Sequence, residues 1–178
     1  LAALVELKTL KLSPPEGTEL GPVLGPMKAL EHVYISSTIM KNLGPLVDAL
    51  KEHPALISIF APQCQVEDIS ALTDLPGLER LQLMGNRITD LKALDGMARL
   101  NSLILSNNRV TDLSPLTGAP NLNTLWLTGN QVQDVTPLKE LKKLRTVLLQ
   151  SNRVSPAQLE ELRQAIPGCR VNNKTANP

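Results

Sequence analysis

The sequence of 178 residues is poor in aromatic side chains, in long apolar runs and in net charge. Aromatic residues make up 2% of the chain, as one tyrosine, one phenylalanine and one tryptophan. No run reaches the roughly 18 apolar residues of a membrane-spanning helix, so we expect no membrane insertion. The 18 basic and 17 acidic side chains nearly cancel, so the overall charge favours neither nucleic acid nor an anionic membrane as a partner.

Leucine, in contrast, recurs with a period of 22 residues from Leu56 onward. The pattern L-x-x-L-x-L-x-x-N-x-I/V-x-D-L-x-x-L is the signature of a leucine-rich repeat, whose units cannot bury their apolar faces alone and must stack. Two looser copies precede the regular ones, and an altered copy follows them. The pattern therefore predicts about seven short parallel strands, starting near Leu7, Leu30, Leu56, Leu78, Leu100, Leu122 and Leu144.

Two polar positions recur inside the blocks. The ninth carries asparagine, whose amide can both donate and accept, so we expect it to satisfy buried backbone groups in the loops above and below. The thirteenth carries aspartate before a proline-tolerant turn, which predicts helix N-caps rather than calcium ligands or paired catalytic acids. These two sets are Asn86, Asn108, Asn130 and Asn152, and Asp68, Asp90, Asp112 and Asp134.

The two cysteines are too far apart for a disulfide. Cys64 and Cys169 are separated by about four repeats, or about 20 Å at the usual strand spacing. Both are expected to be free thiols, with Cys64 filling an asparagine position. His32 and His53 add no metal-ligand spacing, and no nucleophile–base pair or phosphate loop is present. We therefore expect no metal, no cofactor and no enzymatic activity.

The regular spacing ends after Asn152. Ser155 fits an N-cap, Pro156 a first-turn proline and Gln158 a capping-box partner, which predicts a helix that closes the apolar end of the stack. The expected division is a repeat array over 1–154, truncated at its N-terminus, a cap over 155–171 and a disordered tail over 172–178.

The blocks from Leu56 to Lys143, with their LxxLxLxxN strands and DLSPL and DVTPL segments, resemble the 22-residue class of leucine-rich repeats found in bacterial internalins and in a regulatory subunit of protein phosphatase 1. The ending LRQAIPGCRV from Leu162 is similar to the close of many bacterial repeat proteins. The resemblance implies an α/β solenoid: a curved stack with strands on the concave face and short helical turns on the convex face. It implies a bacterial origin but identifies no partner.

Between the inward leucines of each strand, one residue points outward, because strand side chains alternate between faces. All three aromatic residues fall in this slot. An apolar stripe rimmed by small polar side chains, with Arg80 and Met84 beside it, is typical of a protein interface. The expected partner-binding column is Tyr34, Phe60, Gln82, Ile104, Trp126 and Leu148, preceded by Lys11.

We therefore expect a monomeric, non-catalytic module that binds another protein or peptide on its concave face. A structural spacer is the alternative, as is the targeting region of a larger enzyme or receptor. The sequence leaves open whether the protein is cytoplasmic or on a bacterial cell surface.

Overall fold

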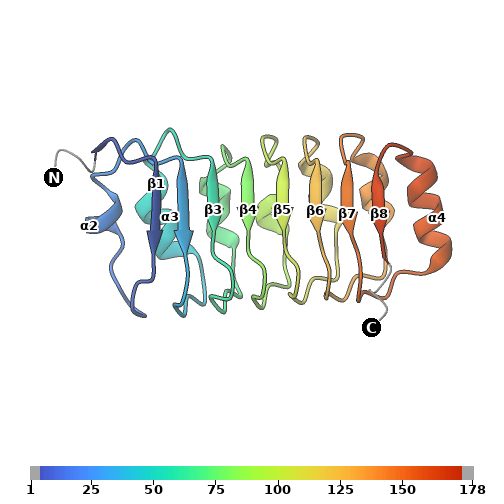
Figure 1. Ribbon diagram of the computed structural model, residues 1–178, viewed down its shortest axis with the longest axis horizontal. Helices are drawn as coiled ribbons and strands as arrows, with labels where there is room; N and C mark the ends of the chain where they lie inside the picture. Colours follow the sequence, from blue (N-terminus) through green and yellow to red (C-terminus); the bar gives the residue numbers. More distant parts are fainter. Residues whose placement is uncertain (1–4, 174–178) are drawn as a thin grey trace.

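The computed structural model describes residues 5–173, and these form a single open sheet of eight parallel strands in sequential order. The strands share one face of the molecule, most of the helical segments lie behind them, and the last helix lies beside the eighth strand at the end of the sheet (Figure 1). They are β1 (Thr9–Leu12), β2 (His32–Ile35), β3 (Ser58–Phe60), β4 (Arg80–Gln82), β5 (Ser102–Ile104), β6 (Thr124–Trp126), β7 (Thr146–Leu148) and β8 (Arg170–Asn172).

The opposite face consists of short helical segments, as the aspartate and proline positions predict. Most are single turns of 3₁₀ helix, which is the usual form of so short a helix. They are α2 (Gly21–Leu24), α3 (Gly44–Leu50), η1 (Ser70–Asp74), η2 (Lys92–Leu94), η3 (Ser114–Gly118), η4 (Thr136–Glu140) and α4 (Pro156–Ala165).

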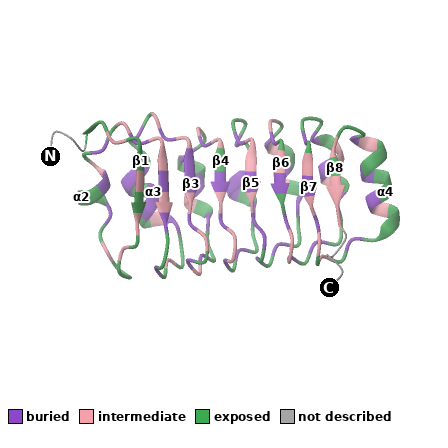
Figure 2. Ribbon diagram, in the orientation of Figure 1, coloured by how far each residue is buried: buried purple, intermediate pink, exposed green. Residues whose placement is uncertain are grey.

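The core lies between the two faces and is built almost entirely from leucine, isoleucine and valine. Inward side chains such as Leu81, Leu103 and Leu125 on the strands are at most 1% exposed. Leu94 and Leu116 meet them from the helical side and are fully buried. Along β2 and β4 to β7, buried residues alternate with residues that remain partly or fully exposed (Figure 2). The apolar core therefore runs through the whole array without interruption.

The eighth strand corrects the expected count of seven. After α4 the chain returns to the sheet, and Val171 pairs in register with Val147 of β7. Sequence reasoning assigned the extended segment at 169–171 to the cap and began the tail at residue 172. Asn172 is instead the last residue of β8, while residues 174–178 of that tail lie outside the described part of the chain.

The helix α4 begins directly after Ser155, the residue predicted to be its N-cap. The hydroxyl of Ser155 accepts a hydrogen bond from the backbone N–H of Gln158, and Pro156 occupies the first turn. The reciprocal half of the capping box differs, because the Gln158 amide donates to Asp134 of the preceding repeat at 3.5 Å. Leu159 and Leu162 face inward and are buried.

The aspartates lie one residue further from their helices than an N-cap does. Asp68 Oδ1 accepts from the backbone N–H of Ser70 at 2.8 Å, and Asp134 does the same with Thr136. The N-cap residue itself is the intervening Ile69 or Val135, so the aspartates form Asx turns that lead into the helices. Hydrogen bonds from Ser70 and Thr136 lower the pKa values of Asp68 and Asp134.

The recurrent asparagines connect each repeat to the one before it. Asn108 Oδ1 accepts from the N–H of Ile88 at 3.0 Å, and its Nδ2 donates to the carbonyls of Leu83 and Leu105, both at 2.9 Å. Because the Leu105 carbonyl also accepts from Asn130, the bonds form a continuous ladder. Each amide serves its own loop and the preceding one, rather than the loops on both sides. We call Asn86, Asn108, Asn130 and Asn152 the asparagine ladder.

Cys64 takes the asparagine position in the third repeat. It is fully buried, and its thiol donates to the carbonyl of Pro62 at 3.3 Å. Burial raises the pKa of Cys64, which keeps the thiol protonated as a donor. Cys64 and Cys169 are both free.

The residue just before each ladder position has a left-handed backbone. Gly85 and Gly129 have φ of 73° and 70°, and Gln63, Asn107 and Ser151 have φ between 55° and 57°. A Cβ at Gly129 would collide with the Asn107 side chain, and one at Gly85 would lie 2.8 Å from the side chain of Gln63. From Gln63 to Ser151, repeats with a side chain here therefore alternate with repeats that have none, whereas Ser37 and Gln63 place side chains in two consecutive repeats.

Asn108→Leu is expected to lower the free energy of unfolding by about 2–4 kcal/mol. The change leaves the buried N–H of Ile88 without a partner, at roughly 1–3 kcal/mol, and removes two further hydrogen bonds. Chemical denaturation measures the loss, with Asn123→Leu at an exposed asparagine as the matched control. Equal midpoints for the two variants would contradict a stabilising role for the ladder.

Gly129→Ala is expected to destabilise the protein more than Gly96→Ala. Both glycines have positive φ, but nothing lies near a Cβ at Gly96, so that variant reports backbone strain alone, at roughly 1 kcal/mol. The additional loss at Gly129 should diminish in the double variant Asn107→Ala/Gly129→Ala, which removes the colliding side chain. Thermal unfolding of the four proteins tests this, and equal losses for both single variants would rule out the side-chain contact.

Candidate functional site

The outward column predicted from the repeats is aligned residue by residue across the sheet. Parallel pairing places Tyr34 opposite Phe60, Phe60 opposite Gln82, and Ile104 between Gln82 and Trp126. Lys11 and Asn172 extend the column at its two ends. We call Lys11, Tyr34, Phe60, Gln82, Ile104, Trp126 and Leu148 the central column.

The side chains of the central column are less uniformly exposed than the alternation of strand side chains between the two faces predicts. Trp126 is 37% exposed, whereas Tyr34, Phe60, Ile104 and Leu148 are half-buried. Side chains on parallel strands lie about 4.8 Å apart across the sheet, so large neighbours cover one another. Trp126 is thus the most prominent apolar side chain of the column.

Tyr34 and Phe60 cover each other by stacking. Their ring centroids are 4.2 Å apart and the planes differ by 3°. The ammonium of Lys11 lies 5.2 Å from the centroid of the Tyr34 ring, within the range of a cation–π contact. The N-terminal half of the column is therefore a rigid block of one cation and two rings, which sequence spacing alone did not predict.

One of the flanking columns is only partly outward. Ser58 occupies an outward position of β3 beside the central column, yet it is fully buried. Its hydroxyl oxygen is 3.2 Å from Nδ1 of His32 and accepts from Nε of Arg80 at 3.1 Å. The two longer side chains lean over the serine from both sides and cover it. Arg80 is thereby held beside the column, while Met84 is half-buried at the opposite rim.

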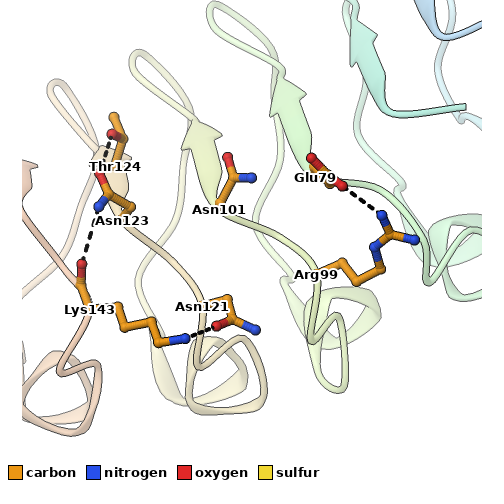
Figure 3. A pocket seen from close by; sticks show the side chains of 7 residues that line it. All are labelled: Glu79, Arg99, Asn101, Asn121, Asn123, Thr124 and Lys143. Atoms are coloured by element: carbon orange, nitrogen blue, oxygen red, sulfur yellow. Dashed lines mark hydrogen bonds and ion pairs between the residues drawn. The ribbon is translucent and has the colours of Figure 1, made fainter.

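A polar cavity of about 540 Å³ lies beside the column, at the N-terminal ends of strands β4 to β7. Asn101, Asn121 and Asn123 line it between the Glu79–Arg99 ion pair and Lys143 (Figure 3). Sequence reasoning missed this site, because it followed the outward residues of each strand. The sequence does contain a sign of this cavity, because polar and charged residues stand just before and just after the first leucine of the blocks that line it.

Neither a metal-binding cluster nor a membrane-spanning helix is found among the described residues. No group of three or more histidine, cysteine, aspartate or glutamate side chains within residues 5–173 could hold a metal ion. Over the same range, no helix is both long and apolar enough to cross a membrane.

Two family models match the chain. One, described as "Leucine Rich repeats (2 copies)", matches residues 98–140, and another, "Leucine rich repeat", matches residues 65–110. No curated protein sequence matches.

Solved structures similar to the chain include two internalins of Listeria monocytogenes. Internalin C2 is 25% identical, with a TM-score of 0.79, over 96% of this chain and 72% of its own. Internalin InlF is also 25% identical, with a TM-score of 0.67, over 96% of this chain and 55% of its own. The APL1 leucine-rich repeat domain shares the fold at 19% identity and a TM-score of 0.71, over 83% of this chain and 40% of its own. The sheet thus lies on the concave face of a curved solenoid.

The Tyr34–Phe60 stack is expected to couple the two side chains by about 0.5–1.5 kcal/mol. A double-mutant cycle with Tyr34→Ala and Phe60→Ala, followed by chemical denaturation, measures this energy. The control cycle pairs Phe60→Ala with Trp126→Ala, which lie three strands apart, and its effects should add. Additive losses in the first cycle would contradict a stabilising stack.

Proposed function

The chain is a leucine-rich repeat protein of the internalin-like class, and from that premise we propose that its concave face binds another protein without catalysing a reaction. The observation that carries the proposal is the central column. All three aromatic residues of the chain lie in it, with Tyr34 and Phe60 on neighbouring strands and Trp126 in the same register three strands further along. The likeness to two Listeria internalins supports a bacterial origin.

Trp126 is the centre of the proposed surface. Ile104 and Leu148 pair with it on either side and extend the apolar surface along the column. Tryptophan and tyrosine supply much of the energy at protein interfaces, because they bury a large area at little cost in conformational entropy. Thr124 and Thr128 give this part of the column a polar rim, as interfaces commonly have.

The position of the aromatic residues favours recognition over a structural spacer. A spacer between domains would need the leucine core and the asparagine ladder, but it would not need large apolar side chains on the sheet surface. A targeting region of a larger enzyme or receptor would also bind through such a surface, so it is a special case of the same proposal.

Trp126→Ala should weaken partner binding at least tenfold while leaving the thermal midpoint nearly unchanged. Trp126 lies outside the core, and truncation of a central interface tryptophan commonly costs about 2 kcal/mol or more. A partner obtained by affinity capture on the wild-type domain would be titrated against both proteins by calorimetry.

Leu125→Ala provides the matched control on the same strand. Leu125 is fully buried, so its truncation should reduce stability by about 2–5 kcal/mol. Binding that survives the combined loss of Tyr34, Phe60 and Trp126 would exclude the central column as the recognition surface. The same conclusion would follow if Trp126→Ala unfolded the protein.

A further inference from the structure

The charges of the chain nearly cancel overall, but they do not cancel along the N-terminal ends of strands β5 to β8. Five cationic side chains precede or begin these strands, and all five are exposed. No acidic residue occupies the corresponding positions of these repeats. We call this cluster the basic edge, and it consists of Arg99, Lys142, Lys143, Arg145 and Arg170.

Ion pairs neutralise the other end of the same edge but leave the basic edge largely free. Near β1 and β2, Lys8 pairs with Glu31 at 2.7 Å. Within the basic edge, Arg99 pairs with Glu79 at 2.6 Å. No ion pair within residues 5–173 joins the other four cations to a carboxylate.

Other acidic residues of this end of the chain form ion pairs with other cations or lie on the helical side. Glu161 pairs with Lys139 at 2.7 Å, and Glu160 lies 3.7 Å from Arg163 of its own helix. Glu140, two residues before Lys142, ends the turn η4 on the helical side. Among the described residues, the ammonium of Lys143 donates to a neutral acceptor, the amide oxygen of Asn121, and to no carboxylate. Four of the five cations therefore present positive charge that no carboxylate within residues 5–173 compensates through an ion pair.

Two cavities open along the basic edge. The larger is the amide-lined cavity of Figure 3, between Arg99 and Lys143, and the smaller, of about 240 Å³, is lined by Lys142, Arg145 and Ile166. Asn101 lies at the centre of the larger cavity, and no side-chain hydrogen bond within the described residues engages its amide. Primary amides match the donors and acceptors of a peptide backbone. Thr124 lines this cavity and lies two residues before Trp126 on β6. Because residues two apart on a strand point to the same face, Thr124 connects the cavity to Trp126.

We infer that the basic edge binds an acidic, extended peptide segment. Carboxylate side chains of the segment face Lys143, Arg145 and Arg170, while its backbone lies on the asparagines of the larger cavity. The inference rests on the proposed function and deepens it, since the segment belongs to the protein that covers Trp126.

A peptide fits this edge better than a polyanion with closely spaced charges. The carboxylate of Glu79 lines the larger cavity and would repel a phosphate or sulfate group placed there. A peptide can place an uncharged residue or a backbone N–H opposite Glu79 and still bring its carboxylates to the cations beyond Lys143. A peptide with spaced acidic side chains therefore matches the basic edge, where amides and one carboxylate are followed by cations.

The test uses a short fluorescent peptide in which glutamates alternate with serine and glycine. Fluorescence anisotropy should show saturable binding at about 50 mM NaCl that weakens at least tenfold by about 500 mM, because salt screens exposed charges. The double variant Lys143→Gln/Arg145→Gln should lose at least tenfold in affinity. The matched control Lys41→Gln/Arg109→Gln removes the same charge from exposed cations elsewhere and should bind like the wild type. Circular dichroism checks that all the proteins are folded.

Three outcomes would overturn the inference. They are no binding at low salt, equal losses in the two double variants, and tighter binding of a single-stranded nucleic acid or a sulfated polysaccharide of equal charge. Trp126→Ala separates this inference from the proposed function. If the acidic peptide does not bind but Trp126→Ala still weakens binding of the natural partner, the basic-edge inference fails. The central column then remains the recognition surface.

Discussion

The hydrogen bonds of the buried asparagines are the interaction on which the rest of this structure depends. A repeat of this length turns sharply after its strand, and the turn leaves backbone groups that no neighbouring strand can pair. Asn86, Asn108 and Asn130 supply the missing partners and share carbonyl acceptors from one repeat to the next. The same hydrogen bonds therefore recur in each of these turns, which helps to keep the strands in register and the outward residues in one column.

Much of the fold could be predicted from the period of the sequence, and the failures occurred where the period ends or where side chains meet. The leucine spacing determines strand positions, inward faces and the alignment of the central column. It could not reveal β8, because Arg170–Asn172 follows a helix rather than another regular block. Three further features depend on contacts between repeats. They are the coverage of Ser58 by His32 and Arg80, the Tyr34–Phe60 stack and the amide-lined cavity. A pattern read within one repeat contains no information on such contacts.

The proposed surfaces divide two physical tasks between neighbouring parts of the solenoid. The central column offers apolar area that becomes favourable only when a partner removes it from water. The basic edge offers charge, which acts over a longer range and contributes more to the rate and specificity of encounter than to affinity. Because both lie near β5 to β7, a single partner could contact them together.

The alternation of the left-handed positions limits how the array can grow. Gln63 leans over Gly85 and Asn107 over Gly129, so each of these long side chains is followed by a repeat without one. Only the short Ser37 is followed by another side chain, that of Gln63. Inserting one extra copy of the Asn107 repeat beside itself would place an asparagine where the structure requires a glycine. Inserting a tandem pair would preserve the order. In the region of long side chains, a designed extension should therefore add the Asn107 and Gly129 repeats as a pair, because a pair keeps each long side chain beside a glycine.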